Sequence, residues 1–189
     1  MLKNIEWGAI AYLTTSIYGQ GLNEVRINNS STFITGCAAT RENGTSYNGC
    51  ENAYNKSIGY LASTTGNISG IYDMSGGSSE YVMGVLEDNL NSNTPLISLS
   101  GFTIFPEYKY YDIYRYGTNE KDYTRYHLGD STIETKGWNH DYASFVYDNK
   151  SWFVRGLGCN YTTSAGIFAF NNLYGHGASG TFSARAILR

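Results

Sequence analysis

Two carboxylates, Asp73 and Glu80, lie seven residues apart across a glycine-containing turn. Their side chains and the carbonyls between them could converge on a hard cation such as Ca²⁺, which accepts six to eight oxygen ligands. A tight turn with two solvated carboxylates accounts for the same residues. Spacing alone favours this second interpretation.

The common catalytic motifs are missing from the sequence. There is no Gly-x-Ser-x-Gly, phosphate loop, Gly-x-Gly-x-x-Gly or His-Glu-x-x-His. His127, His140 and His176 lie in polar contexts without a cysteine or carboxylate at metal-ligand spacing, which predicts solvated or packing histidines. Carboxylates between residues 112 and 134 could form the acid and base of a glycosidase, but spacing does not make any two face each other. We expect no enzyme.

The three cysteines indicate whether the protein folds in an oxidising or a reducing compartment. Cys37 and Cys50 enclose a polar loop that is too poor in apolar residues to be held by packing. A disulfide there would restrict the unfolded chain by about 3 kcal/mol. We therefore predict that Cys37 and Cys50 are joined and that Cys159 is left over. Two free thiols in a reducing cytosol are the alternative.

Composition limits the class of protein. The chain has 189 residues, of which 41% are hydrophobic, so we expect one domain over residues 1–189. Charged residues make up 15%, against about 25% in an average protein, and 18 residues are tyrosine. The 13 basic residues are scattered, which argues against nucleic acid as a partner. No apolar run approaches the roughly 20 residues that a membrane helix needs, so this segment does not insert directly into a membrane.

One helix and several short strands are expected to position the carboxylates, histidines and cysteines named above. Apolar residues at spacings of three and four predict a helix over residues 1–13, and turn-forming residues dominate from 20 to 65. No repeating strand–helix pattern occurs, so the class is α+β. Strands are predicted over residues 81–85, 97–105, 108–116, 144–147, 152–155, 166–170 and 182–188.

The wealth of Asn, Ser, Thr, Tyr and Gly, with few charges, is typical of a bacterial surface protein. The first residues lack the order of regions found in a secretory signal. Either the protein is cytoplasmic or an export segment lies upstream of this sequence. From the composition we expect an extracellular or cell-surface location.

Residues 70–82, Gly-Ile-Tyr-Asp-Met-Ser-Gly-Gly-Ser-Ser-Glu-Tyr-Val, resemble the signature GLYDMSGNVWEW. It belongs to the formylglycine-generating-enzyme-like (sulfatase-modifying-factor) branch of the C-type lectin fold. Residues 4–12 look like that family's EAEWEYAAR helix, and residues 152–185 look like its terminal region RGGSW…RSAxR…GFR. The resemblance implies a C-type lectin fold with an N-terminal helix, short twisted antiparallel strands and long irregular loops.

The same resemblance bears on cofactors. The family's enzymes use two cysteines just after the Arg-Gly step to activate oxygen with copper, whereas residues 157–164 contain Cys159 alone. We therefore expect neither copper nor oxidase activity. The signature departs from the family at residues 77–79, where Asn, a small residue and Trp are usual. The family's calcium site, carried over to this sequence, would use the side chains of Asp73 and Glu80 and the carbonyls of Gly76 and Ser78.

Non-enzymatic members of the branch are more similar. The sequence resembles bacterial pilin-like surface proteins and the variable proteins of diversity-generating retroelements, whose C-terminal region is a hypervariable binding surface. Mutated Asn codons leave Asn or yield residues such as Tyr, His, Cys, Leu or Ala, and residues 155–189 are the candidate variable region. An ordinary polar loop is the alternative. The candidate ligand-binding residues are Leu157, Cys159, Asn160, Tyr161, Asn171, Asn172, Leu173, Tyr174, His176 and Ala178.

These observations predict a non-catalytic ligand-binding domain, an adhesin or receptor-binding module. Its partner would be a protein or glycan on another cell or host surface, because Tyr, Asn, Ser and Gly suit adaptable binding surfaces. A structural pilin-like module is the first alternative. A formylglycine-generating-type oxidase is the second.

Overall fold

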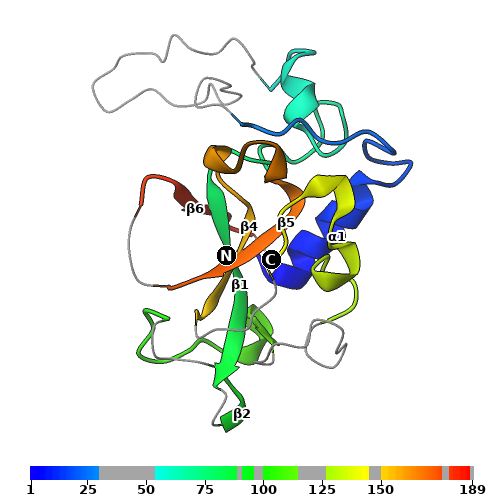
Figure 1. The fold of residues 1–189 in the computed structure, drawn as a ribbon. Coiled ribbons are helices and arrows are strands. Elements are labelled where there is room, and N and C mark those ends of the chain that lie inside the picture. Colours follow the sequence, from blue (N-terminus) through cyan, green and yellow to red (C-terminus); the bar gives the residue numbers. More distant parts are fainter. Residues whose placement is uncertain are drawn as a thin grey trace.

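The computed structural model describes residues 1–29, 54–88, 91–95, 100–114, 127–144, 150–175 and 179–187. One N-terminal helix packs against a small mixed β-sheet (Figure 1). The predicted α+β class is confirmed. No helix within these described ranges is long and apolar enough to cross a membrane.

The helix α1 (Asn4–Thr14) confirms the predicted N-terminal helix. It starts later than expected because Lys3 has an extended backbone, and the Glu6 carboxylate accepts the Lys3 N–H at 2.7 Å. Its buried positions recur at the spacing of one helical face. They are Asn4, Trp7, Gly8, Ala11 and Thr14.

The central strand β1 (Ser79–Asp88) pairs along both of its edges. On one edge β4 (Trp152–Gly156) runs antiparallel to it, and β5 (Gly166–Leu173) runs antiparallel to β4. These three strands confirm predicted ones, and β1 and β5 extend further than the alternation of apolar residues indicated.

The other edge of β1 is covered by separate segments. Strand β6 (Phe182–Ala184) pairs parallel with its start, and β3 (Asp112–Tyr114) pairs parallel further along. Between them, Lys3 forms an isolated parallel bridge with Met83. The prediction of antiparallel strands was therefore wrong in part, because β3 and β6 reach β1 through connections that reverse their direction. The unpredicted strand β2 (Asn91–Pro95) pairs antiparallel with the end of β1.

Other predicted strands are shorter or absent. Residues 100–105 are not a strand, because Phe102 and Phe105 instead pack their rings against Trp152. Residues 145–147 lie outside the described ranges. Short 3-10 helices occupy several connections: η1 (Gly59–Ala62), η2 (Tyr108–Tyr110), η3 (Ile133–Thr135), η4 (Trp138–His140) and η5 (Cys159–Ser164).

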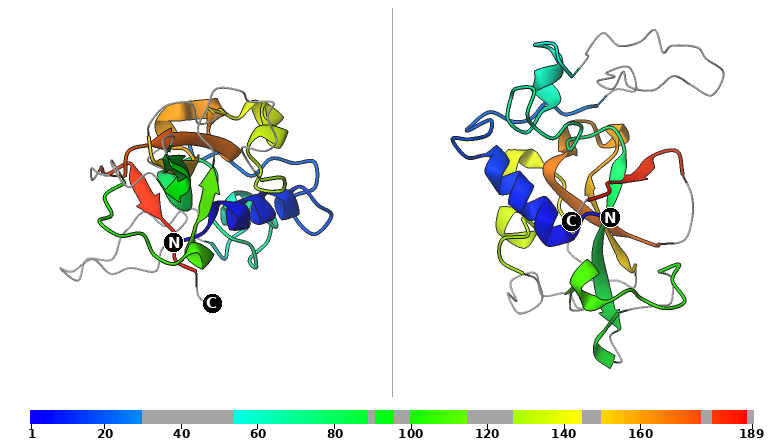
Figure 2. Two further views of the ribbon diagram at one scale, coloured as in Figure 1. Left: turned by 90° about the horizontal axis from the view of Figure 1, so that it is seen from below. Right: turned by 180° about the vertical axis from the view of Figure 1, so that it is seen from behind.

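The two faces of the sheet bury different clusters. Helix α1 lies against one face of the sheet (Figure 2). This face holds the largest core, where Trp7 packs with Phe153 and Phe168. The opposite face has two smaller clusters. One contains Met83, Val85, Tyr111 and Trp152, and the other contains Val154, Leu157, Ala165 and Ala169.

Candidate functional site

Strand β5 divides the predicted binding residues between the two faces of the sheet. Asn172 lies opposite Phe153, on the α1 side, and is only 3% exposed. Asn171 lies opposite Val154 and Leu173 opposite Trp152, and both are partly exposed. Because side chains alternate along a strand, Asn171 and Leu173 share the face that points away from the helix.

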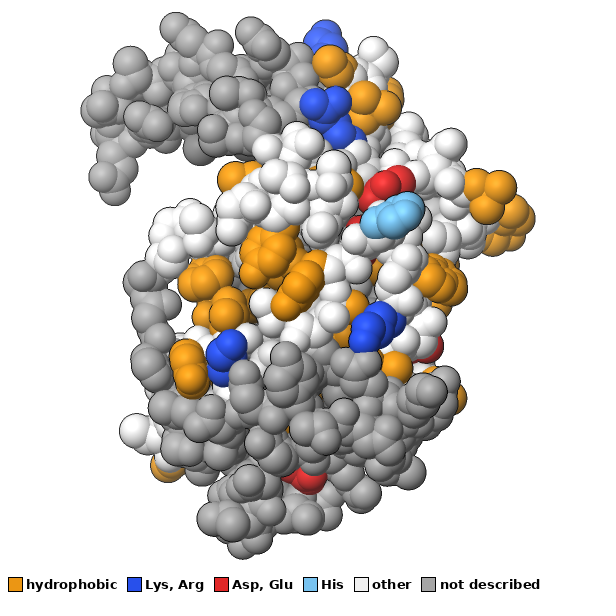
Figure 3. Space-filling view, in the orientation of Figure 1, with side chains coloured by type: hydrophobic (Ala, Val, Ile, Leu, Met, Phe, Trp, Pro, Cys, Tyr) orange, Lys and Arg blue, Asp and Glu red, His pale blue; other side chains and the backbone are white. Residues whose placement is uncertain are grey.

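Around these two residues lies a surface that we call the aromatic face: Tyr81, Tyr142, Tyr161, Leu173 and Phe182. Tyr81, Tyr161 and Leu173 are half-buried over the cluster that contains Val154. The Phe182 ring lies 5.4 Å from that of Tyr81, and the Tyr142 ring lies 5.6 Å from that of Tyr161. Figure 3 shows apolar side chains gathered over β5 in the middle of one face of the molecule.

Neutral hydrogen-bonding groups complete the aromatic face. The Asn171 amide donates to the Tyr161 hydroxyl at 3.4 Å, and the Tyr81 hydroxyl donates to the Tyr174 carbonyl at 2.8 Å. Burial raises the pKa of Tyr81, so its hydroxyl stays protonated at neutral pH. Phenol and amide groups of this kind provide contact area and hydrogen bonds without a net charge.

The loop between β4 and β5 borders this surface. The Cys159 N–H donates to the Gly77 carbonyl at 2.8 Å, which anchors the start of η5. Cys159 is a free, half-buried thiol, and Asn160 is exposed. Thr162 is exposed and adopts φ 52° and ψ −120°, a backbone conformation that non-glycine residues avoid.

The ten predicted ligand-binding residues thus separate into three groups. Leu157 and Asn172 are buried, so their side chains contribute to packing and do not reach the surface. His176 and Ala178 lie outside the described residues. The remaining six are partly or fully exposed: Cys159, Asn160, Tyr161, Asn171, Leu173 and Tyr174.

Sequence reasoning missed three members of the aromatic face. Tyr81 lies on β1, Tyr142 follows η4, and Phe182 begins β6. Tyr81 and Met83 are two residues apart on β1 and share the face away from α1. The alternation of side chains along β1 could therefore have indicated that Tyr81 lies on this face. Tyr142 and Phe182 had no local signal, because only the tertiary structure brings them to Tyr161 and Tyr81.

A buried arginine, Arg155, lies on the opposite side of β4. Its Nη2 donates to the Ser131 carbonyl at 2.8 Å and to the Ser131 Oγ at 2.6 Å. Its Nη1 donates to Asn4 Oδ1 at 3.2 Å and to the Asp130 carbonyl at 3.3 Å. Burial lowers the pKa of Arg155 to about 10, which still leaves it charged at neutral pH. These bonds join β4, α1 and the segment before η3.

The same network includes a buried tyrosine and a carboxyl group. The Tyr114 hydroxyl donates to Asp130 Oδ2 at 2.7 Å and accepts from the Asn4 amide at 2.7 Å. Thr132 Oγ1 donates to Asp130 Oδ1 at 2.7 Å. Burial raises the pKa values of both Tyr114 and Asp130. Because Tyr114 and Asp130 are no more than 1% exposed, the network holds the fold together and does not reach a ligand.

A positively charged side chain, Arg185, lies among the predicted calcium ligands. Glu80 is 5% exposed, and both of its carboxylate oxygens face the Arg185 guanidinium, at 2.5 and 2.6 Å. Arg185 also donates to the Asp73 carbonyl at 2.8 Å, and the Gly76 N–H donates to the Gly156 carbonyl. Burial raises the pKa of Glu80, and the ion pair opposes that rise. A calcium ion at Glu80 would have to displace the Arg185 guanidinium.

Among the residues that the structure describes, no group of three or more His, Cys, Asp or Glu side chains is arranged to hold a metal ion. The calcium site at Asp73, Gly76, Ser78 and Glu80 stays a prediction. A bound cation would stabilise the native state, so chelator should then lower the melting temperature. An unchanged melting temperature would contradict calcium binding. Cys37 and Cys50, the predicted disulfide, lie outside the described residues.

The described structure is an α+β domain with an uncharged aromatic surface on one side of its sheet and a buried polar network on the other. Comparison of the chain with protein-family models, with curated proteins and with solved structures finds no match.

Proposed function

We propose that this protein is a non-catalytic ligand-binding domain, an adhesin or receptor-binding module displayed on a bacterial surface. Its binding surface is the aromatic face together with the η5 loop. The fold is of the C-type lectin type, in its formylglycine-generating-enzyme-like branch. The ligand is a protein or glycan on another cell or host surface.

One observation carries the proposal. Within the segment 155–175, six of the eight predicted binding residues lie at the surface, and large apolar residues alternate with those on β5 underneath. Asn171 and Leu173 are partly exposed, whereas Phe168 and Phe170 are at most 2% exposed. Substitution at the exposed positions can therefore change recognition and leave the core intact.

The chemistry of the surface supports a neutral ligand. Tyrosine provides a large contact area and a hydroxyl at low conformational entropy cost. Aromatic rings stack on the apolar faces of sugars as well as on apolar side chains of proteins. The aromatic face contains no Lys, Arg, Asp or Glu, so strong salt dependence of binding is not expected.

The proposal is tested by comparing two multiple variants on a glycan array and on intact host or bacterial cells. One variant combines Tyr161→Ser, Asn171→Ala, Leu173→Ser and Tyr174→Ser. The matched control replaces two exposed apolar residues elsewhere, Ile104→Ser and Leu128→Ser, which are 81% and 68% exposed. We expect the first variant to lose binding while it still unfolds in one cooperative transition at a somewhat lower melting temperature, and the control to retain binding. Equal binding by both would contradict the site.

Coding DNA provides an independent test of diversification. The codons for residues 155–189 should match a near-repeat in the neighbouring genome, differing only where the repeat has adenine. Such a repeat beside a reverse transcriptase gene would identify the variable positions codon by codon. Without a repeat, a fixed adhesin or a structural pilin-like module is favoured.

A further inference from the structure

A carboxyl group is buried where the chain after η4 meets the start of β5. Asp141 is 5% exposed, and its Oδ2 accepts the Phe168 N–H at 2.9 Å. Its Oδ1 is also buried and has no hydrogen-bond partner in the part of the chain that the structure describes. A Cβ at Gly166 would overlap this carboxyl group, so β5 begins in direct contact with it. A buried oxygen without a partner is far more costly on an ionised carboxylate than on a neutral carboxyl group.

The residue after Asp141 ties the η5 loop to β5. Tyr142 donates its N–H to the Ser164 carbonyl at 2.8 Å, and its own carbonyl accepts the Phe170 N–H at 3.0 Å. The Tyr142 ring lies 5.6 Å from that of Tyr161, which belongs to η5. We call these contacts, together with the hydrogen bond of Asp141, the β5 junction. The β5 junction thus holds the part of the aromatic face that the two tyrosines form.

The backbone on both sides of the β5 junction is strained. Asn139 and His140, which precede Asp141, have φ of 55° and 66°. Thr162, in η5, has φ 52° and ψ −120°. Residues other than glycine adopt such conformations at a cost and keep them only where the surrounding structure holds them. Opening of the junction would relieve this strain, so the closed arrangement depends on its few hydrogen bonds.

Burial and neighbouring charges set the proton affinity of Asp141. Burial is the largest cause that raises its pKa, to about 7, and the charge of Glu24, in the segment after α1, acts in the same direction. The hydrogen bond from the Phe168 N–H and the charge of Arg155 on β4 oppose the rise. Burial also raises the pKa of Glu24, and the charge of His140 opposes that rise.

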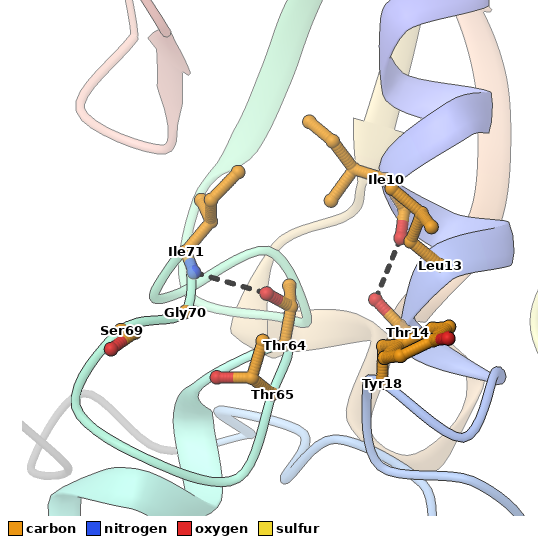
Figure 4. Close-up of a pocket in the computed structure, with 9 residues that line it drawn as sticks. All are labelled: Ile10, Leu13, Thr14, Tyr18, Thr64, Thr65, Ser69, Gly70 and Ile71. Atoms are coloured by element: carbon orange, nitrogen blue, oxygen red, sulfur yellow. Dashed lines mark hydrogen bonds between the residues drawn. The ribbon is translucent and has the colours of Figure 1, made fainter.

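The loop and the strand on the other side of the junction carry no charge. Residues 157–175, which include η5 and β5, contain no Asp, Glu, His, Lys or Arg. The carboxylates of Asp130 and Glu134 interact with Arg155. The pocket of about 270 Å³ beside the end of α1, which Figure 4 shows, is lined by apolar residues, hydroxyl-bearing residues and glycine, so it supplies no carboxyl or imidazole group. At the junction, Asp141 is therefore the buried group that gains a charge as the pH rises through neutrality.

We propose that the β5 junction is a pH-dependent switch, in which neutral Asp141 holds the η5 loop against β5 and ionised Asp141 lets the junction open. In the closed form the Phe168 N–H bonds to a neutral carboxyl group and Tyr142 lies against Tyr161. In the open form the carboxylate is hydrated, the strained residues relax and the two tyrosine rings separate. The switch itself needs no ligand. Its consequence for binding rests on the proposed function: the aromatic face is complete at acidic pH and incomplete at alkaline pH.

The test is amide hydrogen exchange of the full chain, measured by NMR between pH 5 and pH 8 without ligand. Each rate is compared with the intrinsic rate at the same pH, which gives a protection factor. Tyr142 and Phe168, whose N–H groups are bonded in the junction, should lose protection about tenfold or more as the pH rises. Leu86 on β1, whose N–H donates to the Ser151 carbonyl at 3.0 Å, is the reference and should keep a higher protection factor throughout.

Two variants isolate the contribution of Asp141. Asp141→Asn keeps an acceptor for the Phe168 N–H and cannot ionise, so the protection of Tyr142 and Phe168 should be the same at pH 5 and pH 8. Glu107→Gln, at an exposed carboxylate, is the matched control and should keep the wild-type profile. Both variants retain His140, so a pH dependence that came from the imidazole would persist in Asp141→Asn.

Three results would each overturn the proposal. They are protection in the wild type that does not change with pH, protection in Asp141→Asn that still does, and exchange of Tyr142 and Phe168 at the same protection factor as Leu86 at every pH. The last result would mean that the junction opens only when the whole domain unfolds. If Asp141→Asn does not fold, the wild-type profile decides alone. These rates do not depend on whether the aromatic face binds a ligand, so the switch and the proposed function fail separately.

Discussion

The two faces of the β4–β5 pair differ in how well they tolerate amino-acid substitution. Toward α1, Arg155 and Phe170 are fully buried, and the guanidinium is fixed by the hydrogen bonds to Asn4, Asp130 and Ser131. On the opposite face, Asn171 and Leu173 are partly exposed and their polar contacts are few. The alternation of one strand thus combines a fixed core with an exchangeable surface. Substitutions on the two faces should have very different consequences for stability.

The largest effect is expected from Arg155→Ala. The change removes a buried guanidinium and leaves the Asn4 and Ser131 acceptors without their donor. We expect the free energy of unfolding to fall by about 5 kcal/mol, since breaking a buried charged network is strongly destabilising. Chemical denaturation measures it. Lys109→Ala, which breaks an exposed ion pair with Glu107, is the control and should leave the free energy of unfolding nearly unchanged. Similar losses for both would refute the structural role of Arg155.

Neighbouring positions on β5 make the comparison within one strand. Phe170→Ala creates a cavity in the core and should cost about 3–4 kcal/mol. Leu173→Ser, on the aromatic face, should cost about 1 kcal/mol. Equilibrium unfolding of both variants under one set of conditions tests the difference. If Leu173→Ser destabilised the protein as much as Phe170→Ala, β5 would not have an exchangeable face.

The buried carboxyl group of Asp141 makes the stability of the fold depend on pH. The pKa of Asp141 is raised to about 7, chiefly by burial and in part by the charge of Glu24, although the hydrogen bond from the Phe168 N–H at 2.9 Å and the charge of Arg155 oppose the rise. As the pH rises, Asp141 loses its proton in the unfolded chain at a lower pH than in the folded protein. The contribution of Asp141 to the free energy of unfolding is therefore largest below about pH 4 and decreases as the pH rises to about 7.

Asp141→Asn should remove that dependence. Asn keeps an acceptor for the Phe168 N–H and cannot ionise. We expect the variant to gain about 3–4 kcal/mol relative to the wild type between pH 4 and pH 8. Denaturation at a series of pH values measures it, with Glu107→Gln as a control at an exposed carboxylate. A wild-type pH profile in the Asp141 variant would contradict the raised pKa.

Local patterns in the sequence were sufficient for much of the fold. The spacing of Leu2, Ile5, Ala9, Tyr12 and Leu13 predicted α1, although the helix buries the neighbouring face that contains Trp7 and Ala11, and Ala9 and Leu13 are exposed. Short runs of strand-forming residues between turns predicted β1, β4 and β5. These elements bury one face each, so their period is visible in the sequence. Composition placed Asn171 and Leu173 at a surface on a connection after the strand; the structure places them within β5, where both are partly exposed.

Long-range partners were not visible in the sequence. Glu80 pairs with Arg185, and Arg155 bonds to Asn4, over separations of more than a hundred residues. No local pattern encodes such pairs, which is why the sequence revealed neither the Arg185 partner of Glu80 nor the parallel pairing of β3 and β6 with β1. Composition also failed at Leu157. It has the type of an exchangeable residue, yet it is buried at φ 55° beneath the aromatic face.

The smallest predicted effect concerns backbone strain in η5. Thr162 is exposed at φ 52° and ψ −120°, which glycine adopts without steric cost and threonine does not. Thr162→Gly should therefore raise the free energy of unfolding by about 1 kcal/mol, after the loss of backbone entropy is included. Thr163→Gly is the matched control, because Thr163 is exposed and has no positive φ, and it should lose about 0.5–1 kcal/mol. Thermal or chemical denaturation measures both variants. If Thr162→Gly stabilises the protein and Thr163→Gly destabilises it, backbone strain lies at Thr162, beside Tyr161 of the aromatic face. Equal losses of stability would show that the loop is relaxed. Strain at this position would mean that the η5 loop is held in its shape by the anchored strands on either side and not by its own sequence, as an exchangeable loop requires.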